Sequence, residues 1–218
     1  MSKTEMSVDP LAALIRSLAK PGIHLGYRFV AEGDEQSLTP AEAEPFLHAD
    51  VTVRRRSGAA RIVARALLER FHCPGATIAK AASGAPIWPA GIVGSLAHDH
   101  SVAVAAVARA ADVSCLGIDI EAAEPLPDEL VDLVSTPAER VRYGRTLLQD
   151  RRLFVAKEAV YKAVHPVDGI FLDFGDVEVD FERREARTSY GRRVVLDIAI
   201  ASHVVALAYM CSRHSSIE

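Results

Sequence analysis

The sequence predicts an α+β fold of two similar lobes, each a small antiparallel sheet packed on a long helix. Segments 53–71 and 150–164 carry apolar residues at helical spacing, and short apolar runs typical of strands lie near both. In addition, segment 100–107 resembles segment 203–210, because each begins with His and continues mainly in small apolar residues. Two related lobes that meet near residues 112–116 would explain this internal similarity.

The first lobe is predicted from helix-start signals and apolar runs. A short amphipathic helix is expected over 9–20, because an Asp followed by Pro is typical of a helix start. Thr39-Pro40-Ala41-Glu42 is a further start signal, and the strongest helix follows over 53–71. Strands are predicted at 23–31, 93–98 and 101–109.

The second lobe is predicted in the same way. Residues 122–129 are rich in Pro, Glu and Asp and are expected to form a surface loop, and Thr136-Pro137-Ala138-Glu139 is a helix start with a capping box. The long helix over 150–164 is expected to stop at His165-Pro166, because the residue before a proline disfavours helical backbone. Strands are predicted at 116–120, 176–181, 193–199 and 203–211.

The composition excludes several classes of protein. Of the 218 residues, 50% are hydrophobic and 25% are charged, as in an ordinary globular domain. The net charge of −4 argues against a general nucleic-acid binder. No stretch reaches the roughly 18 apolar residues of a membrane span, and no signal-peptide pattern opens the chain.

The cysteines indicate a reducing compartment. Cys73, Cys115 and Cys211 are odd in number, far apart and without the spacing of a metal site. We therefore predict free thiols in a cytoplasmic protein, which we expect to be a monomer.

The run Gly-Ile-Asp-Ile-Glu at 117–121 carries two carboxylates that suit a metal. On a strand, residues two apart point to one face, so Asp119 and Glu121 would converge while Ile118 and Ile120 face the core. A half-buried strand with two solvated acids is the alternative for this run taken alone.

The predicted helix over 150–164 adds a third carboxylate and two lysines. Glu158 and Lys162 are four residues apart and share a face, with Lys157 beside them. Taken alone, they also fit an ordinary surface ion pair. Three carboxylates can hold a hard divalent cation and lysines can hold phosphate, so the two segments together suggest chemistry on a Mg²⁺-bound pyrophosphate.

Two other clusters are less specific. The run Arg54-Arg55-Arg56 gives the 53–71 helix a basic start, which fits either a solvated face or a phosphate clamp. The run Ser95–His100 places two histidines and an acid near a turn, but spacing suggests no third zinc ligand. The sequence contains neither a nucleophile elbow nor a Gly-rich phosphate loop.

The order of these pieces resembles the 4′-phosphopantetheinyl transferases of the Sfp and enterobactin-synthetase type. The resemblance spans about residues 54–163, and its last two motifs are the most specific. The matching motifs, in order, are Ala60-Arg61-Ile62-Val63-Ala64-Arg65, Lys80 before Gly84-Ala85-Pro86 and Trp88-Pro89, Gly94-Ser95-Leu96-Ala97-His98, the complete run 117–121, and Lys157-Glu158 with Lys162.

The chain departs from the family pattern at several positions. Ala60 replaces a glycine, and Ala97 replaces a hydroxyl residue that in the family helps to hold a CoA phosphate, so we expect a weaker or rearranged contact there. Ser57 and Gly58 replace an acidic-aromatic pair, which leaves the register of the preceding arginines open.

The resemblance implies a fold and a reaction. Two α+β lobes, here 1–113 and 114–218, would be related by a pseudo-twofold axis with CoA and the active site between them. The enzyme would transfer the 4′-phosphopantetheine arm of CoA to a serine of an apo acyl- or peptidyl-carrier protein and release adenosine 3′,5′-bisphosphate. The carrier would serve fatty-acid, polyketide, siderophore or peptide synthesis.

The resemblance also implies residue roles. The catalytic residues would be Glu158 and Lys162, either of which could take the serine proton. The metal ligands, for Mg²⁺ or Mn²⁺, would be Asp119, Glu121 and Glu158. The residues that hold CoA would be Arg54, Arg61, Lys80, His98, Lys157 and Lys162.

Other functions remain compatible with the same residues. A non-catalytic CoA-binding protein, a Mg²⁺-dependent phosphodiesterase that uses water, and a structural or interaction domain are the alternatives. For the transferase, a carrier protein with acidic helices calls for a basic and apolar docking surface. Residues 122–149 are the predicted location of that surface, because they connect the two halves beside the metal motif.

Overall fold

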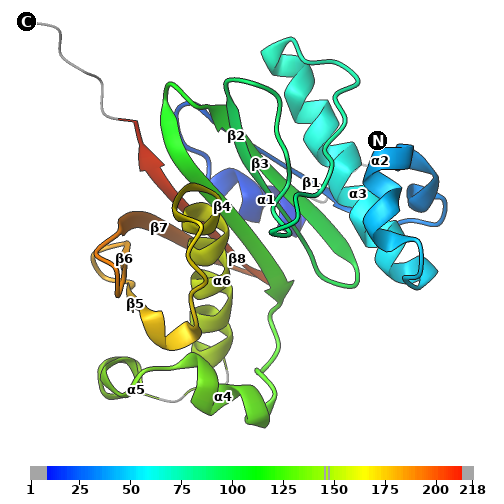
Figure 1. The fold of residues 1–218 in the computed structure, drawn as a ribbon. Helices are drawn as coiled ribbons and strands as arrows, with labels where there is room; N and C mark the ends of the chain where they lie inside the picture. Colours follow the sequence, from blue (N-terminus) through cyan, green and yellow to red (C-terminus); the bar gives the residue numbers. More distant parts are fainter. Residues whose placement is uncertain (1–8, 145, 147, 213–218) are drawn as a thin grey trace, which may run out of the picture.

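Two antiparallel sheets form the molecule, and each packs against one long helix (Figure 1). The computed structural model describes residues 9–144, 146 and 148–212. The predicted α+β class is therefore confirmed. Within the described residues, no helix combines the length and the apolar character needed to cross a bilayer.

The first sheet is built around a strand that is buried on both faces. Its order is β1-β3-β2, formed by β1 (Ile23–Phe29), β2 (Ile92–His98) and β3 (Val102–Arg109). Ala105 and Val107 of β3 pack against α3 (Val51–Leu68), whereas Val104 and Ala106 face a second core. Because both faces are covered, β3 is a continuous run of small apolar residues rather than an alternating one.

The second sheet has the order β4-β8-β7-β6-β5. Its strands are β4 (Val113–Ala122), β5 (Val177–Asp180), β6 (Glu185–Thr188), β7 (Arg193–Ile200) and β8 (His203–Cys211). Strand β8 is also buried on both faces, with Ala206 toward α6 (Gln149–Asp168) and Leu207 toward the opposite core. The two similar segments of the sequence thus fall mainly on β3 and β8, each of which lies between two antiparallel neighbours.

A shared core joins the two sheets. Ile118 and Ile120 of β4, which are fully buried, pack there with Val104 of β3 and with Leu11 of α1 (Pro10–Ser17). Strand β4 also lies beside β2, as Figure 1 shows near the centre of the molecule. The alternation in the 117–121 run therefore places the isoleucines in the core and the acids on the α6 side.

Gly117 allows α6 to lie directly on β4. A Cβ atom at this position would come 2.0 Å from the Ala159 carbonyl oxygen and 2.6 Å from the Ala163 backbone nitrogen. Only glycine permits this approach. The contact places Glu158 and Lys162 of α6 over the carboxylate face of β4.

Seven shorter helices connect these elements within the described residues. They are η1 (Asp34–Ser37), α2 (Pro40–Ala43), η2 (Glu44–Phe46), η3 (Glu69–Phe71), α4 (Asp128–Val134), α5 (Pro137–Tyr143) and η4 (Phe174–Asp176). Of them, η1 packs against α3 and α4 packs against α6. The predicted capping box is present at Thr136 with Glu139, and the helix start at Thr39 also forms one with Glu42.

The predicted end of the long helix is wrong. Helix α6 continues through Pro166 to Asp168 and is capped by Gly169, whose backbone has a φ of 66° and whose N–H donates to the His165 carbonyl. Pro166 lies in the exposed last turn, where it removes only one backbone hydrogen bond. The prediction also missed β6 and placed a loop over the start of α4.

Candidate active site between the sheets

Three cavities of about 360, 260 and 140 Å³ adjoin one another. Lys162 lines the first and the second, and Glu158 and Tyr161 line the second and the third. We name them the cationic, the middle and the apolar cavity. Because His98 comes from β2 of the first sheet and Lys162 from α6, which packs on the second sheet, the cleft lies between the two halves of the chain.

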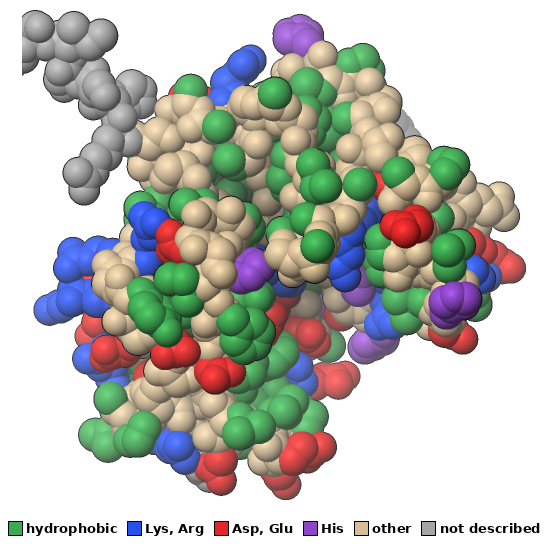
Figure 2. Space-filling model, in the orientation of Figure 1, with side chains coloured by type: hydrophobic (Ala, Val, Ile, Leu, Met, Phe, Trp, Pro, Cys, Tyr) green, Lys and Arg blue, Asp and Glu red, His purple; other side chains and the backbone are tan. Residues whose placement is uncertain are grey.

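The cationic cavity collects basic side chains around one aromatic ring. Arg61, Lys80, His98 and Lys162 line it together with Phe46. The Arg61 guanidinium and the Lys80 ammonium lie 5.7 and 5.5 Å from the centre of the Phe46 ring. In Figure 2, Lys, Arg and His side chains are visible in the hollow between the upper and lower parts of the molecule.

Part of the Arg61 guanidinium bonds to backbone carbonyls of the protein. Its side chain is buried, its Nε donates to the Ile78 carbonyl at 3.0 Å, and one terminal nitrogen donates to the Ser57 carbonyl at 3.2 Å. Burial lowers the pKa of the guanidinium, and Glu42 at 3.9 Å opposes this shift. Arg61 therefore presents the rest of its donor fork to the cavity from a fixed position.

The three arginines that precede Arg61 on α3 have different surroundings. Arg54 does not line the cavity, and Arg55 pairs with Glu35 at 3.0 Å. Arg56 instead acts electrostatically on His98. The helical spacing of α3 places Ser57 and Ala60 on the cavity face with Arg61, a signal that the sequence analysis did not use.

His98 is held in its neutral form. Burial, together with the charges of Arg56 and Lys162, lowers the pKa of its imidazole to about 4. Its Nδ1 atom is buried without a hydrogen-bond partner among the described residues. The next residue, Asp99, lies 3.1 Å from Nε2 of His203 and so links this turn to β8. A neutral ring with a free nitrogen can bond to a ligand phosphate group.

Asp119 and Lys162 form the centre of the cleft. Asp119 is only 6% exposed; its Oδ1 accepts from the Lys162 ammonium at 2.6 Å, whereas its Oδ2 is buried without a hydrogen bond. Burial raises the pKa of the carboxyl, and Lys162 opposes the shift.

The two other predicted metal ligands lie near Asp119. Glu121 is 3.4 Å from Arg151, and burial and the charge of Asp119 raise its pKa. The pKa of Glu158 is raised by the same two causes. Each carboxylate therefore feels its neighbours, which is the electrostatic condition that a bound cation relieves.

The donor chemistry of this group fits Mg²⁺. Mg²⁺ prefers oxygen ligands and takes few of them from protein, and the orphaned Oδ2 of Asp119 is such an oxygen. Among the described residues, however, no three His, Cys, Asp or Glu side chains already stand as a complete metal site. Lys162 occupies the other oxygen of Asp119 in this arrangement.

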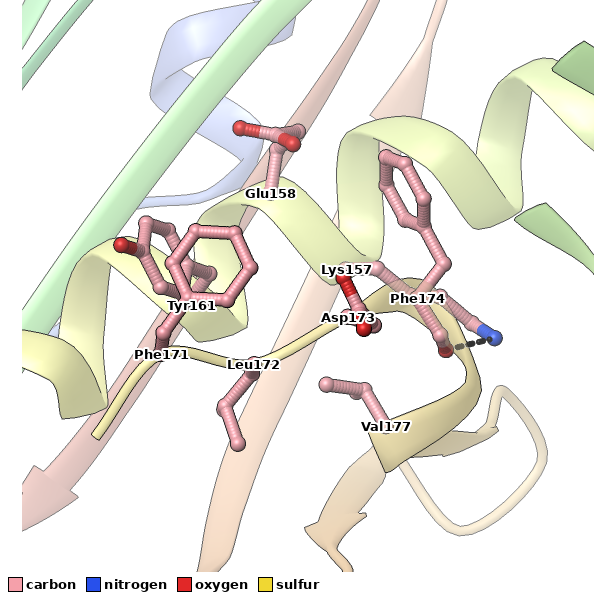
Figure 3. Close-up of a pocket in the computed structure, with 8 residues that line it drawn as sticks. All are labelled: Lys157, Glu158, Tyr161, Phe171, Leu172, Asp173, Phe174 and Val177. Atoms are coloured by element: carbon pink, nitrogen blue, oxygen red, sulfur yellow. Dashed lines mark hydrogen bonds between the residues drawn. The ribbon is translucent and has the colours of Figure 1, made fainter. Parts of the chain in front are cut away.

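The Lys157 ammonium bonds to three groups of the protein. Lys157 is 1% exposed, and its Nζ donates to Val134 O, Glu139 Oε2 and Phe174 O at 2.8, 2.7 and 2.9 Å. Figure 3 shows this ammonium bonded at Phe174 and turned away from the Glu158 carboxylate. The implied CoA contact of Lys157 conflicts with this geometry, because all three of its donors are used.

The apolar cavity continues the cleft beyond Glu158. It is lined by Tyr161, Phe171, Leu172, Phe174 and Val177, as well as by Asp173 and the flank of α6 (Figure 3). The Tyr161 and Phe171 rings pack edge-on with centres 5.7 Å apart. The sequence analysis did not predict this cavity, because residues 169–173 form neither helix nor strand and carry no motif.

The order of cations, carboxylates and apolar side chains defines a site for an elongated ligand that is anionic at one end and uncharged at the other. Residues 41–108 match the family model of the 4′-phosphopantetheinyl transferase N-terminal domain. Residues 115–208 match the model of the 4′-phosphopantetheinyl transferase superfamily.

Curated relatives agree with these matches. The chain is 41% identical over 155 residues to 4′-phosphopantetheinyl transferase PptT of Mycobacterium tuberculosis. This aligned region covers 68% of each protein. It is 40% identical over 148 residues to 4′-phosphopantetheinyl transferase Svp of Streptomyces mobaraensis, covering 65% of this chain and 60% of Svp. Enterobactin synthase component D of Escherichia coli K12 is 36% identical over 96 residues, or 41% of this chain and 45% of that protein.

The chain therefore belongs to the 4′-phosphopantetheinyl transferase superfamily, and the predicted family is confirmed.

Proposed function

We propose that this member of the superfamily binds CoA along the three cavities and transfers its phosphopantetheine arm to a carrier-protein serine. The supporting observation is the order of the cavities. The cationic cavity suits the phosphorylated adenosine end, the middle cavity suits the diphosphate, and the apolar cavity suits the uncharged pantetheine arm. The lobes 1–113 and 114–218 remain our proposed division of the chain.

The phosphate contacts follow from the charges. Arg61 and Lys80 hold phosphate by charge-assisted hydrogen bonds, and neutral His98 adds a ring nitrogen. Lys162 lies between the cationic and middle cavities, so its ammonium reaches phosphate by leaving Asp119. Because Ala97 offers no hydroxyl, these four side chains carry the phosphate contact on this wall.

Asp119, Glu121 and Glu158 are the residues that would hold Mg²⁺, or Mn²⁺ in its place. When bound, the cation neutralises charge that develops on the leaving bisphosphate. The positive charge of a bound cation would lower the pKa of each carboxyl, which burial raises, so that these groups would be ionised in the loaded enzyme.

Glu158 is the better placed of the two proposed catalytic residues to accept the serine proton. It lines both the middle and the apolar cavity, where the diphosphate meets the arm, and its ionised carboxylate can accept a proton. Lys162 is an ammonium paired with Asp119 and has no free lone pair. The serine oxygen forms a bond to the phosphorus of the arm, the bond to the bisphosphate breaks, and Glu158 takes the proton.

We place the carrier-protein contact at residues 122–149, as the sequence suggested. A groove of about 740 Å³ there is lined by Pro125, Leu126, Val131 and Leu148. Arg151 lies beside the groove, where it donates to the Glu124 and Pro125 carbonyls, each at 3.0 Å. The apolar walls suit the apolar contact of a carrier protein, whereas Asp128 and Asp150, which also line the groove, do not add the basic character that an acidic carrier helix calls for.

Intact-mass measurement tests this function. Purified protein is incubated with CoA, Mg²⁺ and a panel of apo carrier proteins. We expect a gain of one phosphopantetheine on at least one carrier, which EDTA abolishes. Consumption of CoA without any carrier would support a phosphodiesterase instead, and CoA binding without modification of any carrier would support a non-catalytic protein.

A further inference from the structure

Lys157 joins three separate segments at one buried point. Its ammonium bonds to Val134 at the end of α4, to Glu139 in the first turn of α5 and to Phe174 in η4. Glu139 is 1% exposed and also accepts from the backbone N–H of Val179 at 2.9 Å. This buried group takes no part in the reaction described above, although it adjoins Glu158 in sequence.

We propose that Lys157 is a positioning residue that fixes the wall of the apolar cavity and so sets affinity for the uncharged arm of CoA, not for its phosphates. The inference rests on the proposed function. It assigns to Lys157 a role different from the CoA contact that the family resemblance implied.

The cavity wall needs such an anchor. Residues 169–173 form neither helix nor strand, and Phe171 within them is 70% exposed. The wall is held at its far end by the bond from Lys157 to the Phe174 carbonyl, at 2.9 Å, and by packing of the Phe174 and Phe154 rings. Both anchors come from α6, the helix that carries Glu158 and Tyr161. One rigid element thus sets the catalytic carboxylate and the cavity wall in a fixed relation.

Stability alone does not account for a buried lysine here. A buried ion pair contributes little compared with well-packed apolar residues of the same size, because both charges lose their hydration. What apolar residues cannot do is bind two carbonyls and a carboxylate in fixed directions. The geometry therefore favours orientation of α4, α5 and η4 as the role of Lys157.

Helix geometry supports the separation from the phosphates. Adjacent residues on an α-helix are about 100° apart, so the Lys157 side chain leaves α6 in a different direction from those of Glu158 and Lys162, although Lys157 also lines the apolar cavity. Figure 3 shows the two neighbours diverging in this way. In the described structure, all three donors of Lys157 have protein partners.

Two ligands separate the roles. CoA carries the arm, whereas 3′-phosphoadenosine 5′-diphosphate carries the same phosphates without it. Calorimetry measures the affinity for each ligand. We expect Lys157→Met to weaken the binding of CoA by roughly tenfold or more and the binding of the nucleotide by less than about twofold. Phe174→Ala, which removes the wall directly, should give the same selectivity. Equal losses for both ligands in Lys157→Met would overturn the inference, because a lost phosphate contact affects both.

Two further variants distinguish a specific loss of CoA affinity from a loss of folding. Lys157→Met with Glu139→Gln removes both charges and keeps a capping box, so no buried charge is left unpaired. Arg65→Met with Glu42→Gln is the matched control, because Arg65 holds the buried Glu42 at 3.0 Å but neither residue lines any of the three cavities. The double variant at Lys157 and Glu139 should show the loss of CoA selectivity and the control should not.

The wild-type protein tests the underlying function separately. If it bound CoA no more tightly than the nucleotide, the proposed function of the apolar cavity would fail. If it preferred CoA and the double variant kept that preference, only the role of Lys157 would fail.

Discussion

The two halves of the molecule use the same tetrapeptide, Thr-Pro-Ala-Glu, in the same structural position. At 39–42 and at 136–139 it opens a helix through a capping box and buries its glutamate. Glu42 accepts from the Ile78 backbone N–H at 2.7 Å, and Glu139 accepts from that of Val179 at 2.9 Å. Each glutamate is also bound by a basic residue of the long helix in its half.

The halves differ in what the long helix does next. In α3, Arg65 binds Glu42 while Arg61, one turn earlier, keeps part of its fork for the cationic cavity. In α6, Lys157 binds Glu139, and all three N–H donors of its ammonium have protein partners, while Glu158 and Lys162 line the cleft. One half thus supplies mainly cations and the other mainly carboxylates. Similar scaffolds can divide the recognition of one ligand by charge.

Loss of the central carboxylate should have the largest effect. We expect Asp119→Ala to lower the transfer rate by roughly a thousandfold or more, because electrostatic stabilisation of the leaving group depends on it. The temperature of thermal unfolding should be unchanged or slightly higher, since the substitution removes a buried carboxyl whose pKa is raised by burial. Full activity of this variant in Mg²⁺ would contradict the metal assignment.

The two buried glutamates test whether the halves are equivalent in stability. Glu42→Ala and Glu139→Ala each leave a buried cation and backbone N–H groups without their acceptor, so each should cost about 3–5 kcal/mol. Urea unfolding measures both. A loss in one half that is several times smaller than in the other would show that the resemblance is superficial.

His98 should make stability depend on pH. The folded ring stays neutral down to a pKa of about 4, whereas an unfolded histidine binds a proton near pH 6.5. Between these values the unfolded chain binds more protons, so stability falls as the pH is lowered, by at most roughly 3 kcal/mol. His98→Gln should flatten this part of the curve. An identical pH dependence in variant and wild type would contradict the buried neutral ring.

Lys80 offers the mildest test of the cationic half. Lys80→Ala should raise the Michaelis constant for CoA by roughly tenfold with little change in kcat, because one charge-assisted contact is lost. Arg61→Ala should raise it as well but should also destabilise the protein, since Arg61 bonds to the Ile78 and Ser57 carbonyls. A fall in kcat without a change in the Michaelis constant for Lys80→Ala would argue against a binding role.

Local periodicity explains what could be predicted from sequence. The alternation at 117–121 and the four-residue spacing of Glu158 and Lys162 depend only on strand and helix geometry, so both predictions hold for the fold. The bonds of the Lys157 ammonium depend instead on α4, α5 and η4, which helix periodicity cannot place.

Other features depend on contacts between distant segments. Phe46 and Phe171 come from segments without a motif, and tertiary packing alone places them at the two ends of the cleft. Pro166 did not end α6, because a proline in the last turn removes little hydrogen bonding. These features required the folded chain.

The division between a cation-rich and a carboxylate-rich half is tested most directly by calorimetry of CoA binding with Mg²⁺ and with EDTA. We predict that Lys80→Ala weakens the binding of CoA by a similar factor in both conditions. Asp119→Ala should remove the part of the affinity that Mg²⁺ adds and leave binding in EDTA close to that of the wild type. A loss for Lys80→Ala only in Mg²⁺, or an equal loss for Asp119→Ala in EDTA, would contradict the division.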